Sequence, residues 1–292
     1  ETTYGTTPAT PAFKTIRHTG TNLALSKNTM ISEELRADRQ ISDFRHGTKQ
    51  TGGDISTEMS FGSFDDFLEA ILCGTWTSDV LKAGVTRRSF SVMRYFSDLA
   101  GGAKPYHLFT GVEMSKLALS VAVNAIVKAV FSTVGQAQTV ATAAPTGSTY
   151  VAAPTVGVMD SFSGAIKEGG TTIAVITEVS LTLENGIEPK FVVGSDTTIH
   201  PSIGRSNCTA QITAYFEDSS LLDKFINETE SSLELNIADK AGNKYTILLP
   251  RIKYTGGQPD TQGQGPITLA MPIQALFDSV TGTNIQITRD AA

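Results

Sequence analysis

Leu117-Ala-Leu-Ser-Val-Ala-Val-Asn-Ala-Ile-Val-Lys-Ala-Val-Phe-Ser132 alternates between apolar and small or polar residues over most of its length. Successive side chains of a β-strand point to opposite faces, so this period of two predicts a sheet with one apolar face. The apolar face carries Leu117, Leu119, Val121, Val123, Val127 and Phe131, and a later stretch repeats the pattern with Ile267, Leu269, Met271, Ile273 and Phe277. The chain is therefore expected to be mainly β.

The sequence contains echoes of itself, which suggest one unit written twice. Phe13–Leu25 is echoed by Phe162–Val175, and Asp98–Tyr106 is echoed by Asp239–Tyr245. The echoes keep their order, and a repeat this long predicts a duplicated domain and not a solenoid of short units. Each half is long enough to bury a core of its own.

The repeat sets the expected domain boundaries. We predict a flexible arm at 1–12, a first β domain at 13–135, an Ala/Thr/Pro/Gly linker at 136–158 and a second β domain at 159–292. A linker of this composition is expected to order poorly and to leave the halves free to lie side by side.

Each half is also expected to contain one short helix, which makes the fold class mainly β with short helices (α+β). In the first, Ser63 is the expected N-cap, the apolar stripe lies within 64–72, and Gly74 is the expected residue after the helix. In the second, Asp218 is the expected cap and Asn227 the expected end, with a stripe of Leu221, Leu222, Phe225 and Ile226.

Turn residues then predict β-hairpins after each helix. The strand pairs are 90–96 with 106–109, and 233–237 with 245–249, with turns rich in Asp, Gly and Asn at 98–104 and 239–243. The Gly-rich segment 256–265 is expected to be a long hairpin loop, and 284–288 a final strand.

Composition narrows the possible partners. The net charge is −6, from 23 basic and 29 acidic residues, which argues against a surface that grips nucleic acid by neutralising phosphates. It does not exclude a protein past which nucleic acid slides. The N-terminus shows no apolar signal segment. The longest apolar stretch, Leu117–Phe131, is too short for a membrane helix and contains Asn124 and Lys128, so no membrane span is expected.

No set of residues predicts catalysis, a metal site or a cofactor. The four histidines fall in different elements without metal-ligand spacing, and nucleophile-elbow, phosphate-loop and HExxH motifs do not occur. Asp65 and Asp66 are explained by the dipole at a helix N-terminus. Cys73 and Cys208 are expected to be buried thiols. We therefore expect a protein that is not an enzyme.

A long polar stretch at 33–52, with a counterpart at 188–206, is the best candidate for a functional surface. Mixed Arg and Asp over so long a connection suits specific pairing with a partner, although an ordinary solvated loop is the alternative. The candidate contact residues are Arg36, Asp38, Arg39, Asp43, Arg45, Lys49, Lys190, Asp196 and Arg205.

Three segments, Glu34–Asp43, Gly53–Trp76 and Phe162–Gly170, resemble the tail tube proteins (major tail proteins) of long, non-contractile-tailed bacteriophages, the siphophages. The resemblance covers about residues 13–290 and implies two tandem tail-tube β-sandwich or barrel domains. It also implies a structural virion protein with no enzymatic activity, located in the phage tail and assembled in the host bacterial cytoplasm. Rings of such subunits stack into a tube that conducts DNA from capsid to host.

The resemblance implies partners as well. The simplest relatives carry one tube domain and form six-chain rings, so two domains per chain imply a trimeric, pseudo-sixfold ring, with a hexamer as the alternative. Further partners would be tape-measure, tail-tip and tail-terminator proteins, and double-stranded DNA passing through the lumen without specific binding. The small or polar strand faces are expected to line the lumen, through Ser120, Asn124, Lys128, Thr268, Gln274 and Asp278. The alternative function is a β-sandwich binding module, such as a receptor-binding or virion decoration protein.

Overall fold

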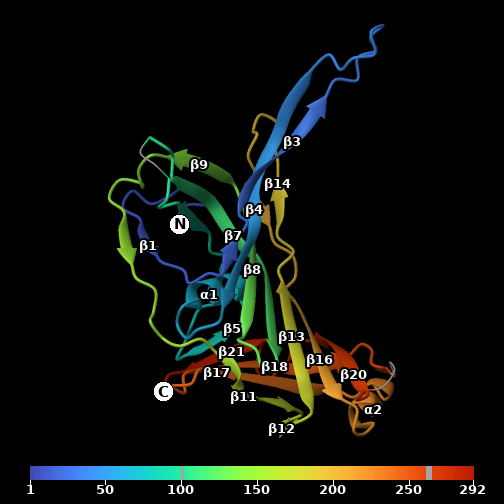
Figure 1. Ribbon diagram of the computed structural model, residues 1–292. Helices are drawn as coiled ribbons and strands as arrows, with labels where there is room; N and C mark the ends of the chain where they lie inside the picture. Colours follow the sequence, from blue (N-terminus) through green and yellow to red (C-terminus); the bar gives the residue numbers. More distant parts are fainter. Residues whose placement is uncertain (100–101, 261–264) are drawn as a thin grey trace.

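The computed structural model describes residues 1–99, 102–260 and 265–292 (Figure 1). Within these ranges the chain is mainly β with two short helices, and most strands join one continuous sheet, so the predicted fold class is confirmed. The predicted turn at 98–104 and the predicted loop at 256–265 lie partly outside the described residues.

In the first half, four strands pair in the order β3 (Ala24–Ile31), β4 (Phe44–Glu58), β8 (Lys128–Gly135) and β7 (Tyr106–Ala122). The N-terminal part of β7 also pairs with β6 (Phe90–Tyr95) and β9 (Ala137–Ala141), and the short β2 (Gly20–Thr21) pairs with β4. The predicted hairpin of 90–96 with 106–109 is confirmed.

The opening alternating stretch is a hairpin of two strands, and the predicted place of Val123 on the apolar face was wrong. The chain reverses between β7 and β8, where Asn124 has a positive φ of 59° and Val123 is 56% exposed. On both strands the alternation itself is confirmed, because Leu117, Leu119, Val121, Val127 and Phe131 are buried.

The second half repeats the pairing of the central strands, with β13 (Ile176–Glu184) in the place that β2 takes beside β4. Its order is β13, β16 (Asn207–Tyr215), β20 (Thr268–Ala275) and β18 (Lys244–Tyr254), and β18 also pairs with β17 (Ser231–Ala238) and β21 (Gln286–Asp290). The predicted hairpin of 233–237 with 245–249 is confirmed. Ile267 and Phe277 are 41% and 62% exposed, so their predicted places on the apolar face were wrong.

Only one of the two sequence echoes marks equivalent positions. Asp98–Tyr106 and Asp239–Tyr245 both fall where the β6–β7 and β17–β18 hairpins turn. By contrast, β1 (Ala12–Lys14) pairs with β10 (Thr149–Val151), whereas β11 (Asp160–Glu168) pairs with β12 (Thr171–Thr172) and β17. The duplication is thus carried by strand pairing more faithfully than by sequence.

The two halves share one sheet and one core. Residues 116–122 of β7 pair with residues 184–178 of β13, and β5 (Val80–Lys82) pairs with β21. Buried side chains of both halves form a single apolar cluster, in which Met59 and Leu117 lie with Tyr245 and Ile287 around a very small cavity. The expectation of a separate core in each half was therefore wrong, because the apolar faces cover each other.

The two helices differ in burial although they occupy the same place in the repeat. In α1 (Asp65–Leu72) the apolar stripe is buried, whereas α2 (Ser220–Ile226) buries no residue. The helix-boundary predictions were partly wrong. Phe64 and Ser219 stand at the N-cap positions, and Cys73, with φ of 48°, takes the left-handed conformation expected of Gly74. Asn227 ends α2 as predicted.

Gly74 is required for a different reason. A Cβ there would lie 2.1 Å from the carbonyl oxygen of Lys82, so the segment after α1 can approach β5 only with glycine.

Both segments expected to be flexible instead contact the rest of the chain. The carboxylate of Glu1 accepts hydrogen bonds from Ser91 and from the backbone of Gly5 and Gly111, which ties down residues 1–12. The segment 136–158 contains β9 and β10, which pair with β7 and β1. Backbone pairing compensates for the scarcity of large side chains there. The division of the chain into two domains at this segment stays a prediction.

Candidate assembly surfaces

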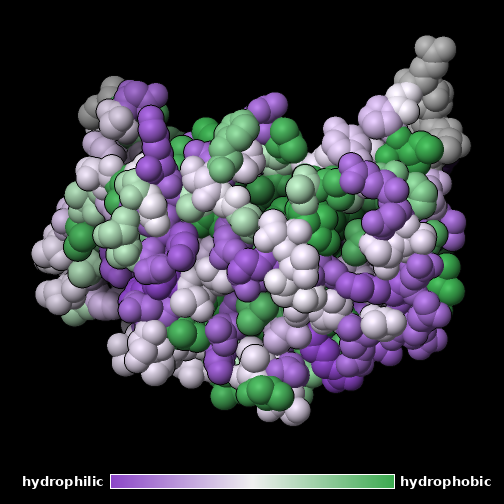
Figure 2. All heavy atoms as spheres, turned by 90° about the horizontal axis from the view of Figure 1, so that it is seen from below, coloured by the Kyte–Doolittle hydropathy of each residue, from purple (hydrophilic) through white to green (hydrophobic). Residues whose placement is uncertain are grey.

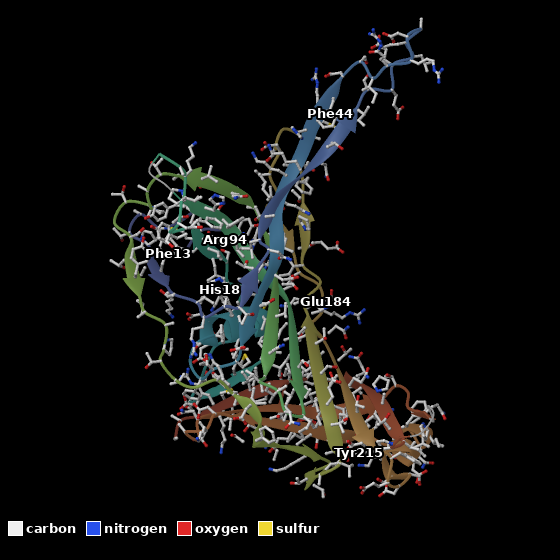
Figure 3. All side chains as sticks on the ribbon, viewed as in Figure 1. Phe13, His18, Phe44, Arg94, Glu184 and Tyr215 are labelled. Atoms are coloured by element: carbon white, nitrogen blue, oxygen red, sulfur yellow. The ribbon has the colours of Figure 1, made fainter. Side chains whose placement is uncertain are left out.

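The most prominent feature is a projecting hairpin, which we call the first arm: residues 24–50, formed by β3 and the first part of β4 (Figures 1 and 3). The predicted polar connection at 33–52 is strand only from Phe44 onward, where β4 begins, and residues 33–43 form the end of the hairpin. Arg36 pairs with Asp38 at 2.8 Å, and Arg45 pairs with Asp43 at 2.9 Å. The hydrogen bond from Arg36 lowers the pKa of Asp38.

The first arm also exposes apolar side chains that the charge pattern did not reveal. The exposed set is Met30 at 56%, Ile31 at 53%, Leu35 at 100%, Ile41 at 68% and Phe44 at 51%. Phe44 lies far out on the hairpin, away from the body (Figure 3). Apolar residues gathered on a projecting element mark a contact surface, because monomers seldom expose such groups together.

A second arm, residues 188–202, is the hairpin of β14 (Glu188–Lys190) and β15 (Ile199–Ser202) with its connecting loop. Its tip lies on the first arm. The Lys49 ammonium contacts the Asp196 carboxylate at 2.7 Å, and the backbones of Lys49 and Thr197 form a parallel β-bridge. Lys190 stands opposite Ile199 in the strand pairing of this hairpin, and Arg205 is exposed just after the hairpin. Of the predicted contact residues, Lys49 and Asp196 are thus brought together across the two halves.

The second arm is seated on the first half of the same chain. His200 Nε2 lies 2.8 Å from Glu113 Oε1, and Arg87 joins the same carboxylate at 2.6 Å. Arg87 also donates to the carbonyl of Pro201 at 2.8 Å, and Gln136 donates to the carbonyl of Thr198 at 3.0 Å. Glu113 is buried, so its charge is stabilised by partners from both halves.

One face of the shared sheet is polar and points away from the core. Ser120 stands opposite Lys128 on one side and Ser180 on the other, and Thr209 stands opposite Gln274. Thr268 lies on the same face opposite Tyr215. The acids of this face are Asp54, Glu58, Glu178 and Glu184, against the lysines Lys116, Lys128 and Lys253. We call this surface the polar face.

Two of the predicted lumen residues lie elsewhere. Asn124 is in the β7–β8 turn, and Asp278 is in the turn after β20, where its carboxylate accepts hydrogen bonds from the Thr281 backbone and hydroxyl. These hydrogen bonds lower the pKa of Asp278. The predicted places of Asn124 and Asp278 on a strand face were wrong, because β7 ends at Ala122 and β20 ends at Ala275.

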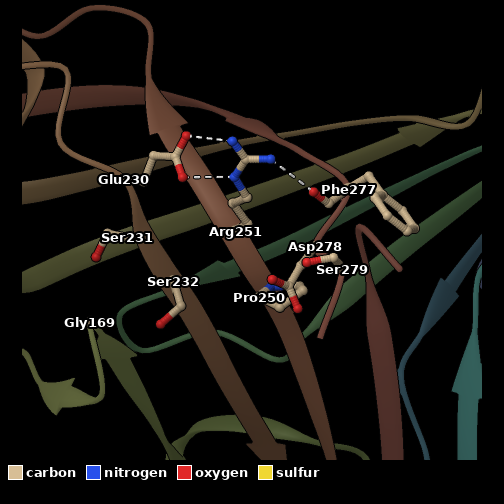
Figure 4. A pocket seen from close by; sticks show the side chains of 9 residues that line it. All are labelled: Gly169, Glu230, Ser231, Ser232, Pro250, Arg251, Phe277, Asp278 and Ser279. Carbon is tan, nitrogen blue, oxygen red and sulfur yellow. Dashed lines mark hydrogen bonds and ion pairs between the residues drawn. The ribbon is translucent and has the colours of Figure 1, made fainter. Parts of the chain in front are cut away.

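A groove of about 570 Å³ lies on the second half (Figure 4). Arg251 holds both carboxylate oxygens of Glu230 at 2.7 Å and donates to the carbonyl of Phe277 at 3.1 Å. The bond from Arg251 lowers the pKa of Glu230. The other lining residues are Gly169, Ser231, Ser232, Pro250, Asp278 and Ser279.

Other chemistry is sparse in the described parts of the chain. They contain no cluster of His, Cys, Asp or Glu arranged for a metal ion, and no helix there is long and apolar enough to span a membrane. Cys73 and Cys208 are buried and unpaired with each other, as predicted, and burial raises the pKa of Cys208 to about 12.

A comparison with protein families gives a match over most of the chain. The family model described as phage tail tube protein matches residues 1–275. The chain belongs to the phage tail tube protein family. No curated protein matches it. Membership makes this tail tube protein a structural component of the virion tail, which agrees with its mainly β fold.

Sequence reasoning found the arms of the tail tube protein but not their partners. Glu113 and Arg87 carried no recognisable pattern, and His200 was one of four histidines without metal-ligand spacing. The groove was also missed, because its residues come from four separate segments. An unexplained acid such as Glu113 in the middle of an apolar strand was the one available signal.

Proposed function

We propose that this tail tube protein forms three-chain rings that stack into a siphophage tail tube, through which the genome passes from capsid to host. Each chain fills two of six equivalent positions. The observation that carries the proposal is the junction inside the chain, where β7 of the first half pairs with β13 of the second. A sheet that already runs from one unit to the next can close a ring by repeating the same junction.

The repeat identifies the edges that would close the ring. Ile55 and Ala210 hold the same place, because each stands ten residues before the first residue of its helix, Asp65 in α1 and Ser220 in α2. They pair with Phe131 and Ile273, which therefore match as well. Thr21 pairs with Ile55, and Leu181 pairs with Ala210, so Thr21 matches Leu181. Residues 18–24 therefore correspond to residues 178–184 of β13.

The other edge follows from the same strands. Leu117 pairs with Phe131, and Tyr254 pairs with Ile273, so residues 253–259 correspond to residues 116–122 of β7. Repeating the inner junction then places Tyr254 of one chain opposite Leu23 of the next. Exposed strand edges invite pairing, and ring closure would leave neither of these two edges open.

The different burial of the helices supports the same closure. On α1, Asp65 accepts a hydrogen bond from Tyr245 of the second half and lies 2.6 Å from Arg289, whose guanidinium covers the Trp76 ring. The matching helix α2 has an ion pair within its own half, between Lys224 and Glu168, but it buries no residue, and Ile226 is 64% exposed. Seen from the end opposite the first arm, apolar patches interrupt a hydrophilic surface (Figure 2). The first half of an adjacent chain would cover α2.

The polar face suits the lining of a DNA conduit. Acids outnumber lysines on it, and a surface that does not neutralise phosphates lets DNA slide without being held. Ser120, Lys128, Thr268 and Gln274 are the predicted lumen residues that lie on this face. Tape-measure, tail-tip and tail-terminator proteins are the further partners in this proposal, and the role requires no enzymatic activity.

The alternative of a binding module has little support, because Trp76 stacks on Tyr245 and on Arg289 and offers no exposed aromatic platform. Electron microscopy of purified protein after polymerisation tests the proposal. We expect hollow tubes built from three-chain rings. Solid rods, or protein that stays monomeric under all assembly conditions, would overturn it.

A further inference from the structure

We infer that the groove of the second half is the seat for the first arm of an adjacent copy of this chain. The inference rests on the proposed ring, which supplies the adjacent copy, and it names the contact made beside the sheet edges. The second arm is seated on a surface of the first half. The groove is the matching surface of the second half, and nothing in the described chain is seated there.

The correspondence can be followed residue by residue. Met114 pairs with Thr133 of β8, and Ile252 pairs with Ala275 of β20, so the preceding residues Glu113 and Arg251 match. Three residues after Thr133 stands Gln136, and three residues after Ala275 stands Asp278. Gln136 holds the second arm, and Asp278 lines the groove.

The ion pair at this position is also repeated, with its charges exchanged. In the first half, Arg87 lies just before β6 and pairs with Glu113 on β7. In the second half, Glu230 lies just before β17 and pairs with Arg251 on β18. The first pair is covered by His200 and Pro201 of the second arm, whereas the second pair faces the groove.

The repeat also identifies the occupant. Asp54 and Thr209 match, because they pair with Ser132 and Gln274 at equivalent places. Nine residues before Asp54 stands Arg45, still on β4, and nine residues before Thr209 stands His200, on β15 across the connection 203–206, so Arg45 is the counterpart of His200 in sequence count. The segment 44–47 of the first arm would therefore enter the groove as the segment around His200 enters its own seat.

Arg45 would lie beside Arg251, the counterpart of Glu113, so its partners in the groove are the neighbouring carboxylates of Glu230 and Asp278. A carboxylate offers about four lone-pair sites, so Glu230 and Asp278 can accept hydrogen bonds from Arg45 while they keep those from Arg251 and Thr281. Phe277 at the groove is 62% exposed and Phe44 of the arm is 51% exposed, which gives an apolar contact beside the polar one. Both aromatic rings would be covered together.

Cysteine cross-linking tests this assignment. Phe44→Cys, Arg45→Cys and His46→Cys are each combined with Ser279→Cys, while the buried Cys73 and Cys208 stay in place. Tubes are assembled, oxidised and run on a denaturing gel without reductant. We expect at least one pair to convert most of the protein into linked oligomers that reductant dissolves. The matched control replaces Ser279→Cys by Lys240→Cys, at an exposed turn, and should stay monomeric.

The outcomes separate the two proposals. Tubes that assemble but give no cross-link above the Lys240 control overturn the seat in the groove and leave the tube intact. Linked oligomers without tubes support the seat and contradict the proposed function. Wild-type protein that yields neither tubes nor, in the variants, cross-links overturns both.

Discussion

Tyr245→Phe is the perturbation that tests most directly whether the two halves are one folding unit. The Tyr245 hydroxyl accepts a hydrogen bond from the backbone N–H of Gly62 at 2.8 Å and donates to the carboxylate of Asp65. Burial and the nearby Asp65 raise the pKa of this tyrosine, so it stays a neutral donor. Removing the hydroxyl cuts the polar link from α1 to β18.

The expected loss follows from the kind of bond. A hydrogen bond to a charged group contributes about 1.5–3 kcal/mol, and the Gly62 N–H loses its acceptor as well. Asp65 keeps its ion pair with Arg289, which limits the damage. We therefore expect the free energy of unfolding to fall by about 2 kcal/mol.

Urea unfolding of the unassembled protein provides the assay. The matched control is Tyr4→Phe, whose hydroxyl is buried and has no hydrogen-bond partner among the described residues, so its loss should not lower the free energy of unfolding. One cooperative transition is expected for wild type and both variants, because the halves share a core. Two separate transitions, or a Tyr245→Phe variant as stable as wild type, would refute the reasoning.

Four further predictions follow from other contacts. Gly74→Ala should lower the free energy of unfolding by roughly 1–3 kcal/mol in urea titrations, because its Cβ would meet the carbonyl of Lys82 at 2.1 Å. Glu113→Gln should free the second arm, seen as faster proteolysis within 188–202, because it removes the charge that holds Arg87 and His200. Glu234 has a lowered pKa owing to Lys167, so it stabilises the fold at neutral pH and loses this effect as pH falls below about 5; Glu234→Gln should flatten the stability–pH curve there. Replacing residues 32–43 by a short turn should leave melting unchanged but abolish tube formation in sedimentation assays.

Each of these has a control or a contradicting result. Gly157→Ala places its Cβ 3.9 Å from the nearest atom and should be neutral, so equal losses at both glycines would refute the close-approach argument. Unchanged proteolysis of Glu113→Gln would show that the buried carboxylate does not hold the arm. A stability–pH curve unaltered by Glu234→Gln would remove Lys167 as the cause. Tubes assembled without residues 32–43 would exclude the first arm from assembly.

Sequence alone predicted the parts of the fold that depend on local pattern. Alternation placed Leu117 and Phe131 in the core, and turn chemistry located the β6–β7 and β17–β18 hairpins. The β7–β8 turn was missed because Val123 and Ile126 make it apolar, like the strands beside it.

The remaining errors concern contacts between distant segments. Nothing local to β9 or β10 shows that their backbones pair with β7 and β1. The N-cap of α1 was misplaced because the Ser63 hydroxyl is used by Ser60 and not by the helix. The arms were found from charge, but their apolar side chains and the seat at Glu113 depend on register and long-range packing, which composition does not encode.

The central claim is that three chains close one ring by pairing residues 18–24 with residues 253–259 of the next chain. Ala24 and Lys253 should stand opposite each other there, as Glu184 and Lys116 do within the chain. Directly opposed residues of paired strands have Cβ atoms about 4.5–5.5 Å apart, close to disulfide reach. Assembled Ala24→Cys/Lys253→Cys tubes, oxidised and denatured, should therefore give covalent species that end at three chains. A ladder that continues to six chains, or intact tubes with no linked species, would contradict the claim.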